Sequence, residues 1–229
     1  MATVMLSLGI SVAAQNCNSL NVSSIKNQDL KISSIINYKS DVILLSDVRL
    51  NGKHASVLAK FGLWYTVYYN STRNSRGVAV LISKQVEHSV VASAADPQEN
   101  ALIMKLVING KNVIIGSIYG PNDNNCVPFF NFISGTLNGW RDCPVILGGD
   151  WNATPSCLPV NDNPDVMFMR NIPSQVRSEH IRDLCEFADL SDPFRTLYPD
   201  ARDFSYHPSG NTRKNRSRID FFFGIVLVI

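Results

Sequence analysis

Apolar and polar residues alternate at the start of the chain. The apolar positions that repeat with a period of two are Leu6, Leu8, Ile10 and Val12. Successive side chains of a strand point to opposite faces, so this alternation predicts a strand with one buried face. The stretch also has some features of a weak signal peptide. It lacks a positively charged N-terminal region, however, and we interpret it as a retained part of the fold.

Two apolar runs rich in β-branched residues flank Asn109 and Gly110 within residues 101–119. An Asn-Gly pair tolerates the positive φ angles of a tight turn. The pattern therefore predicts a β-hairpin.

Three aspartates lie at or inside short apolar runs. Residues 41–47 and 144–150 each end in an aspartate, and Asp220 lies inside a third run. Such runs are typical of strands buried on both faces, which places Asp47 and Asp150 at strand ends. A carboxylate in that setting is costly unless it is paired or bound to a metal.

The other elements follow from weaker patterns. Helices are expected at 23–37, 126–137 and 178–188. Strands are expected at 63–69, 77–82, 89–92, 204–206 and 218–223. Residues 152–173 contain four prolines and no periodicity, which is typical of a functional loop. Strands outnumber helices, and the fold class predicted is α/β with mixed sheets.

The composition is that of a globular protein, and it excludes only a few classes of protein. The 229 residues include 21 Lys and Arg against 19 Asp and Glu, a net charge of +2, with 45% hydrophobic residues. This excludes disordered, collagen-like and coiled-coil chains, and no apolar run is long enough to cross a membrane. A nucleic-acid partner would therefore have to be recognised by a local site. No repeat or linker divides the chain, so we expect one domain over residues 1–229.

The five cysteines are scattered and form no C-x-x-C pair. This argues against a zinc site and against a disulfide framework, and it favours a reducing, intracellular compartment. Without zinc-type ligands, the strand-end acids and amides are the oxygen donors of a hard cation such as Mg²⁺, which points to phosphoester hydrolysis. Each acid also has a purely structural interpretation: Asp47 as a turn cap, Asp150 as the start of a loop, and Asp220 paired with Arg218.

Five short segments carry a resemblance to a known family. They are Asn16-Cys-Asn-Ser-Leu, Leu45-Ser-Asp-Val-Arg-Leu, Gly116-Ser-Ile-Tyr-Gly-Pro-Asn, Leu147-Gly-Gly-Asp-Trp-Asn and Ser217-Arg-Ile-Asp-Phe. In order and approximate spacing they resemble the endonuclease/exonuclease/phosphatase superfamily, and most of all the apurinic-endonuclease-like domain of LINE-type non-LTR retrotransposons. The resemblance implies a deoxyribonuclease I-like fold. This is a two-sheet β-sandwich flanked by helices, with the site at one edge where the sheets meet.

The resemblance also implies a role for each matching residue. Asn16 and Asp47 would hold Mg²⁺, with Mn²⁺ as a substitute, and Tyr119 would line the scissile phosphate. Asp150 would orient or deprotonate the attacking water, Asn152 would hydrogen-bond the phosphate or the transition state, and Asp220 would orient a catalytic histidine. Tyr119 fits equally well as a strand-end aromatic residue that closes the core.

Two positions depart from the family pattern. The family usually has Glu where this chain has Asp47, which is one methylene shorter. The family's Ser-Asp-His motif should follow Asp220, but only nine residues follow and none is histidine. None of His54, His88, His180 and His207 matches that motif. We therefore expect a domain that is incomplete at its C-terminus, lacks the last strand, and leaves an apolar end at 221–229 partly uncovered.

Candidate DNA contacts surround the last motif. Ser205 and Ser217 match hydroxyl positions that lie near the DNA or the site in the family. Arg213, Lys214 and Arg216 belong to a basic run that could bind phosphates. A basic run of this kind is also typical of a solvated loop.

The sequence thus predicts a magnesium-dependent, DNA-nicking endonuclease of a retrotransposon, which leaves a 3′ hydroxyl that primes reverse transcription. The expected setting is a monomer that acts on DNA in the nucleus, with a reverse transcriptase domain in a longer product and no membrane association. One alternative is an impaired, truncated copy that keeps the fold and weak DNA binding. Another is a different phosphodiesterase of the superfamily, acting in abasic-site repair or on lipids.

Overall fold

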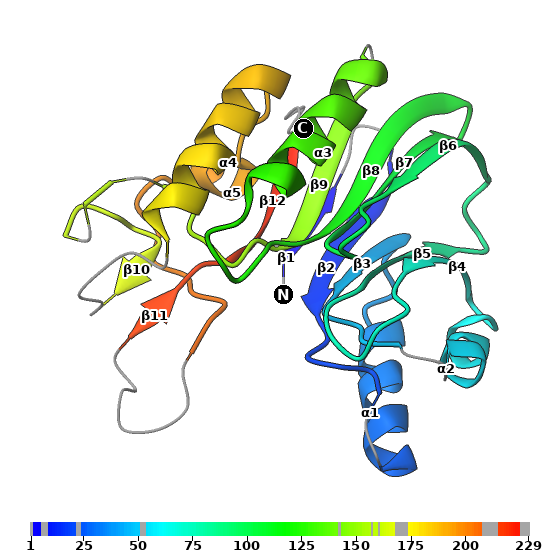
Figure 1. The fold of residues 1–229 in the computed structure, drawn as a ribbon. Coiled ribbons are helices and arrows are strands. Elements are labelled where there is room, and N and C mark those ends of the chain that lie inside the picture. Colours follow the sequence, from blue (N-terminus) through cyan, green and yellow to red (C-terminus); the bar gives the residue numbers. More distant parts are fainter. Residues whose placement is uncertain are drawn as a thin grey trace.

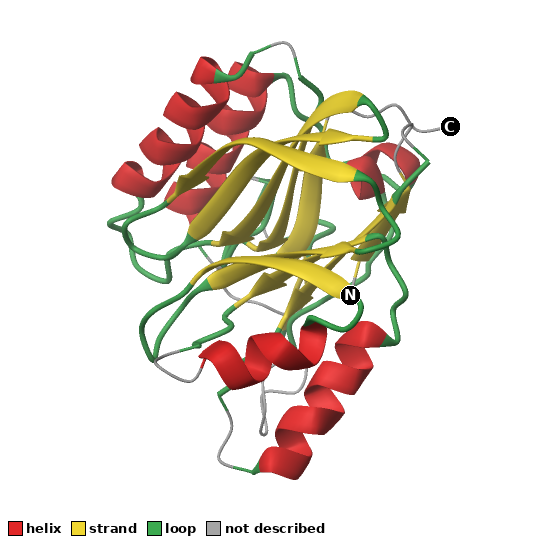
Figure 2. Cartoon of the chain, turned by 90° about the vertical axis from the view of Figure 1, so that its right-hand side faces the viewer, coloured by secondary structure: helices red, strands yellow, loops and turns green. Residues whose placement is uncertain are grey.

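Two five-stranded sheets lie face to face at the centre of the computed structural model, and helices cover the outer face of each (Figure 1, Figure 2). The structure describes residues 2–5, 9–21, 24–50, 54–141, 143–156, 158–159, 161–167, 174–207 and 215–224. The result is a mixed α/β sandwich of four layers, which confirms the predicted fold class.

The first sheet is built from the first part of the chain, in the order β1-β2-β3-β5-β4. Its strands are β1 (Ala2–Met5), β2 (Ser11–Asn16), β3 (Val42–Ser46), β4 (Tyr65–Asn70) and β5 (Val78–Ser83). Strands β2 and β3 are parallel, and the other pairs are antiparallel. The parallel pair brings the carboxyl ends of β2 and β3 to one edge.

The second sheet has the order β12-β9-β8-β7-β6. Its strands are β6 (His88–Ala95), β7 (Ala101–Ile108), β8 (Lys111–Tyr119), β9 (Val145–Asp150) and β12 (Asp220–Gly224). Only β8 and β9 run parallel within it. A separate short ladder joins β10 (Val166–Met167) to β11 (Arg216–Ser217).

Apolar side chains fill each of the three spaces between the layers. The helices are α1 (Ile25–Ile36), α2 (His54–Phe61), α3 (Val127–Gly139), α4 (Gln175–Ala188) and α5 (Pro193–Leu197). Val80 and Met104 lie between the sheets, Ile35 of α1 packs on the outside of the first sheet, and Ile133 and Ile181 belong to the cluster outside the second. None of the described helices has the length and apolar character needed to cross a membrane.

The predicted hairpin is confirmed. Strands β7 and β8 pair from Ala101 with Ile118 to Ile108 with Lys111, and the turn places Asn109 at φ 49° and Gly110 at φ 76°. The two strands expected to be buried on both faces are also confirmed as β3 and β9, whose residues are all buried.

The single strand predicted from the first alternating residues is wrong. The chain forms two antiparallel strands, β1 and β2, with Met5 opposite Ser11 and Gly9 at φ 72° between them. Alternation is the same for one long strand and for two short ones, and a glycine at positive φ allows the reversal. Leu6 and Leu8 lie outside the described residues. The strand predicted at 204–206 is wrong as well, because Tyr206 forms only an isolated bridge with Ser217.

The end of the described chain is better covered than the sequence predicted. Phe221, Phe222 and Phe223 of β12 are all buried, and Gly224 bridges Ser191. The expectation of a partly uncovered apolar end is therefore wrong for these three phenylalanines. Residues 225–229 lie outside the described part of the chain.

Candidate active site

The predicted site residues meet where strands of both sheets end. In the first sheet Asn16 ends β2 beside Ser46, so the next residue, Asp47, lies near it. In the second sheet Tyr119 and Asp150 end the parallel strands β8 and β9 as register partners, and Asp220 lies opposite Asp150 on β12. The topology thus gathers at one edge residues that are far apart in the sequence.

A side-chain hydrogen bond joins the two sheets at this edge. Asn16 Nδ2 donates to Asp150 Oδ2 at 2.7 Å. The amide cannot turn freely, because Asn16 Oδ1 accepts from the backbone N–H of Asn18 at 2.9 Å. The two residues were predicted to serve one site, and the structure brings them together.

Asp150 is a buried carboxylate with a strongly shifted acidity. It is 3% exposed, and its Oδ1 accepts from the Asn152 N–H at 2.8 Å. Burial, followed by the charge of Asp220 and, more weakly, that of Asp47, raises the pKa of Asp150 to about 7, although its hydrogen bonds act in the opposite direction. A carboxyl group with this pKa can exchange a proton with water near neutral pH.

Asp220 faces Asp150 and has spare hydrogen-bonding capacity. Its Oδ1 is buried without a hydrogen-bond partner, and burial raises its pKa. Ser205 Oγ accepts from the backbone N–H groups of Ile219 and Asp220, which fixes the start of β12. An orphaned buried carboxylate oxygen points to a missing partner at this place.

The described histidine side chains all have other partners. His88 bonds to Tyr68, His180 stacks on Phe130, and His207 Nε2 bonds to the carbonyl oxygen of Phe204. Within the described residues, no histidine is hydrogen-bonded to Asp220. The side chain of His54 lies outside the description.

Asp47 is held by a residue that the sequence analysis did not single out. Arg49 Nε donates to Oδ1 at 2.7 Å and Nη2 to Oδ2 at 2.8 Å, and these bonds to Asp47 raise the pKa of Arg49. Both residues have positive φ angles, 53° and 50°. Strained loop residues of this kind concentrate at functional sites. The only sequence signal was an opposite charge two positions away.

Tyr119 has the structural role that the sequence left open, and its hydroxyl lies at the candidate site. It is buried and belongs to the cluster between the sheets, so its ring does close the core. Its hydroxyl accepts from Asn122 Nδ2 at 3.4 Å, and burial followed by the charge of Asp47 raises its pKa. The hydroxyl therefore stays protonated and can donate a hydrogen bond at the site.

Asn152 occupies a tightly held turn after β9. Its φ is 51°, and its Nδ2 donates to the Gly120 carbonyl at 2.8 Å. Arg177 of α4 donates to the Asn152 carbonyl through Nε at 3.2 Å and Nη2 at 3.0 Å, and to the Asp123 carbonyl through Nη1 at 3.0 Å. Arg177 is 7% exposed. Nothing in the sequence pointed to this arginine, which lies 25 residues after Asn152 and, among the atoms of that residue, bonds only to the backbone carbonyl.

The residues predicted to contact DNA differ in their exposure to solvent. Ser205 and Arg216 are exposed, whereas Ser217 is only 1% exposed and its hydroxyl is covered. Arg213 and Lys214 lie outside the described residues.

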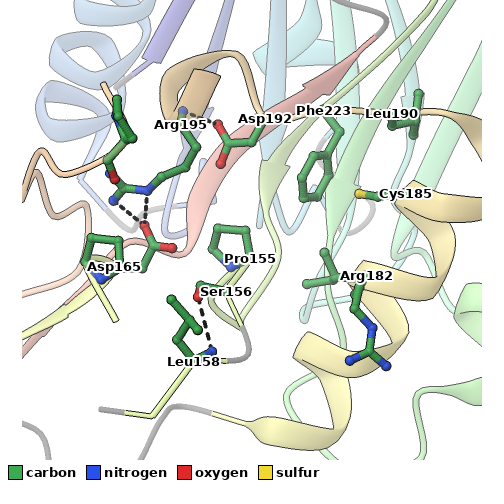
Figure 3. A pocket seen from close by; sticks show the side chains of 13 residues that line it. Pro155, Ser156, Leu158, Asp165, Arg182, Cys185, Leu190, Asp192, Arg195 and Phe223 are labelled. Atoms are coloured by element: carbon green, nitrogen blue, oxygen red, sulfur yellow. Dashed lines mark hydrogen bonds and ion pairs between the residues drawn. The ribbon is translucent and has the colours of Figure 1, made fainter. Parts of the chain in front are cut away.

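A hollow of about 390 Å³ lies beside α4 and α5, with Asp165 in its lining (Figure 3). Asp165 Oδ1 accepts from both Arg195 and Arg218, and Arg218 also bonds to Asp192. These ion pairs hold the chain two residues before Asp220 and so position the start of β12. Among the described residues Arg218 forms ion pairs with Asp165 and Asp192 and not with Asp220, so the alternative that Asp220 pairs with Arg218 is wrong.

The oxygen donors at the edge suit a hard cation. Within the described chain, no three His, Cys, Asp or Glu side chains are arranged as a metal cluster. Mg²⁺ is usually held by only one or two protein oxygens together with water and substrate phosphate. Burial is the first cause of the raised pKa of Asp150, and the negative charges of Asp220 and Asp47 add to it; a cation at this edge would offset that charge. Asn16 and Asp47 carry side-chain oxygens at this edge that could hold such a cation, although both Asp47 oxygens accept from Arg49.

Comparison with known proteins identifies relatives of this fold. The sequence model of the endonuclease/exonuclease/phosphatase family matches residues 15–224. Among solved structures, an AP endonuclease from Leishmania major has a TM-score of 0.72 and 17% identity, covering 93% of this chain and 77% of its own. A 3′-5′ exonuclease from Neisseria meningitidis has a TM-score of 0.67 and 19% identity, covering 93% and 86%. The endonuclease domain of TRAS1, a telomere-specific non-LTR retrotransposon, has a TM-score of 0.61 and 13% identity, covering 93% and 83%.

Proposed function

The chain belongs to the endonuclease/exonuclease/phosphatase family, and we propose that it hydrolyses a phosphodiester bond of DNA to leave a 3′ hydroxyl. The observation that carries the proposal is the hydrogen bond from Asn16 to Asp150. It joins the candidate cation side of the site, in the first sheet, to the candidate proton acceptor in the second. A phosphate bound at this edge would meet both.

Asp150 is the proposed proton acceptor. Asn16 and the Asn152 N–H each bind one of its oxygens, so the carboxylate is oriented before substrate arrives. In the reaction the water oxygen forms a bond to phosphorus and the P–O3′ bond breaks; Asp150 takes the proton that the attacking water releases, and the departing O3′ takes a proton from solvent to become the 3′ hydroxyl. A pKa of about 7 keeps much of Asp150 ionised at neutral pH while making it a stronger base than an exposed aspartate.

The remaining residues act on the phosphate. The protonated Tyr119 hydroxyl and the Asn152 side chain are donors suited to the charge that grows on the phosphate oxygens. Asn16 and Asp47 would hold Mg²⁺ or Mn²⁺, which would supply Lewis-acid stabilisation of that charge. Both oxygens of Asp47 accept from Arg49, so this ion pair would have to open for the cation to bind.

The orphaned oxygen of Asp220 favours a second candidate, an impaired enzyme that retains the fold and weak DNA binding. In the family this aspartate is expected to orient a histidine, and no described histidine side chain meets it. Loss of one phosphate-contacting group would cost roughly 3 kcal/mol, about a hundredfold in rate.

The biological setting is also proposed. The TRAS1 domain is similar in fold and belongs to a non-LTR retrotransposon. The motifs of this chain resemble the same group, which supports a nick that primes reverse transcription by a domain of a longer product, in the nucleus. Action at abasic sites and action on lipid phosphodiesters are the competing functions.

The test measures nicking of supercoiled plasmid in Mg²⁺ by the 229-residue chain and by Asp150→Ala. We expect slow nicking by the parent, at least about a hundredfold less by Asp150→Ala, and no change for Asp183→Ala, an exposed acid of α4. Extension of the product by a DNA polymerase would identify the 3′ hydroxyl.

Parallel assays with an abasic oligonucleotide and with sphingomyelin separate the competing functions. Equal nicking by the parent and Asp150→Ala would exclude the assigned site. If the parent does not nick plasmid but binds the oligonucleotide, the impaired-enzyme candidate is correct.

A further inference from the structure

A lysine outside the site holds the loop that carries Asn16. Lys31, on α1, donates from Nζ to three successive backbone carbonyls: those of Cys17 at 3.0 Å, Asn18 at 2.9 Å and Ser19 at 2.9 Å. An ammonium group has three N–H donors, so these contacts satisfy it completely. The next carbonyl, that of Leu20, accepts from Gln28 of the same helix at 2.9 Å.

The opposite side of the same loop is bonded to the end of β3. The N–H groups of Cys17, Ser19 and Leu20 donate to the carbonyls of Ser46, Asp47 and Val48 at 2.8–2.9 Å. The loop therefore lies between α1 and the segment that carries Asp47. A contact that holds the loop carbonyls in place on the helix side therefore also holds the loop N–H groups in place against the backbone of residues 46–48.

Three carbonyl dipoles aimed at one point repel one another unless a cation occupies that point. Asn18 and Ser19 adopt positive φ angles of 44° and 68°, a conformation that costs energy in non-glycine residues. The hydrogen bonds to the end of β3 hold the N–H side of the loop, but they do not offset the repulsion among its three carbonyls. A cation at the Lys31 position is what makes the arrangement favourable.

We propose that residues 17–19 form a carbonyl cage for a cation, filled in this chain by the Lys31 ammonium, and that Lys31 is thereby a positioning residue for the metal ligands Asn16 and Asp47. The inference rests on the proposed function for its consequence, but the cage itself does not. Lys31 has no role in proton transfer, since all its donors are directed at the loop.

The first experiment tests the cage without metal or DNA. Amide hydrogen exchange of Ser19 and Leu20 would be measured by NMR in the parent, in Lys31→Met, and in Lys26→Met, an exposed lysine of the same helix. We expect exchange to be at least about tenfold faster in Lys31→Met, because loss of the cation loosens the loop. Lys26→Met should match the parent. Unchanged exchange in Lys31→Met would overturn the cage.

A second variant tests the chemistry of the cage and serves if Lys31→Met does not fold. Lys31→Ala removes the atoms of a propylammonium ion. Purified with millimolar propylammonium, Lys31→Ala should recover slow exchange at Ser19 and Leu20. Tetramethylammonium has the same charge but no N–H donor and should not restore it. Equal effects of the two ions would overturn the proposed hydrogen-bonded cage.

The last measurement tests positioning. Mn²⁺ binding, followed by electron paramagnetic resonance in the absence of DNA, should weaken by about tenfold in Lys31→Met and recover with propylammonium in Lys31→Ala. Faster loop exchange with unchanged Mn²⁺ affinity would show that Lys31 is merely structural. If the parent itself binds no Mn²⁺, the proposed metal function and the positioning role both fail, while the exchange data still decide the cage.

Discussion

Arg49 engages both carboxylate oxygens of Asp47, through Nε at 2.7 Å and Nη2 at 2.8 Å, only two residues away along the chain. Asp47 is buried, while the Arg49 side chain is 37% exposed. The guanidinium therefore neutralises the carboxylate from the solvent side. A divalent cation and Arg49 would have to share or exchange the same two oxygens.

Arg49→Gln should tighten Mn²⁺ binding, because the carboxylate loses its internal competitor. A partly exposed ion pair contributes up to about 1 kcal/mol, so the gain should be no more than roughly fivefold. Titration followed by electron paramagnetic resonance measures it. Arg182→Gln, which removes an exposed arginine of α4, is the control and should leave the affinity unchanged. Weaker binding in Arg49→Gln would mean that Arg49 supports the cation site.

The raised pKa of Asp150 predicts a pH dependence of activity. Nicking should increase through about pH 7, because the proposed base is ionised only above its pKa of about 7. In Asp150→Asn the residual rate should lose this rise. A parental profile that is already flat at about pH 5.5 would assign the proton acceptor to another group.

The same shift predicts a pH dependence of stability. The folded state holds a proton on Asp150 that the unfolded state, with an ordinary pKa of 3.8, has released. Stability should therefore fall as the pH rises from about 4 to about 7, and the Asp150→Asn variant should lack this loss. Between about pH 4 and about pH 7, the free energy of unfolding of the parent should fall relative to that of Asp150→Asn by up to about 4 kcal/mol. Urea denaturation at about pH 4.5 and about pH 8 measures it.

Arg177 should affect catalysis through the Asn152 turn. Arg177→Met removes two hydrogen bonds to the Asn152 carbonyl and one to that of Asp123, so Asn152 should lose its fixed position. We expect kcat for nicking to fall about tenfold or more with a smaller change in KM. Arg177→Lys should recover part of the rate. Arg182→Met on the same helix is the control, and an equal loss in both variants would indicate general damage to α4.

Local sequence patterns predicted those parts of the fold that local rules determine. The hairpin at Asn109 and Gly110 and the buried strand ending at Asp150 follow from turn chemistry and apolar runs. The helix at 54–61 was not predicted, because its amphipathic pattern spans only eight residues and is too short to indicate a helix from the sequence alone. The two strands at 2–5 and 11–16 were predicted as one, since alternation does not reveal a reversal.

The residues of the candidate site were likewise predicted only in part. The family-like motifs indicated Asn16 and Asp150, and the sheet topology brings them within hydrogen-bonding distance. The residues that hold the site loops, Lys31 and Arg177, were not predicted, because each acts on backbone carbonyls rather than on another side chain. A bond to a carbonyl places no requirement on the partner's residue type, so no sequence motif records it.

Two glycines provide a matched test of how closely the site strands pack. A Cβ on Gly120 would lie 2.2 Å from the carbonyl oxygen of Trp151, a backbone atom that cannot move aside without shifting the turn that carries Asn152. Gly120→Ala should therefore lower the free energy of unfolding by about 1–3 kcal/mol and reduce nicking as well. Gly135 is exposed in α3, and a Cβ added there would meet nothing within 4 Å, so Gly135→Ala should instead raise stability by about 0.5–1 kcal/mol. Urea denaturation of both variants gives the comparison. A neutral Gly120→Ala would show that the β8 and β9 ends are looser than this contact requires, and that the positions of Tyr119 and Asp150 are not fixed by backbone packing.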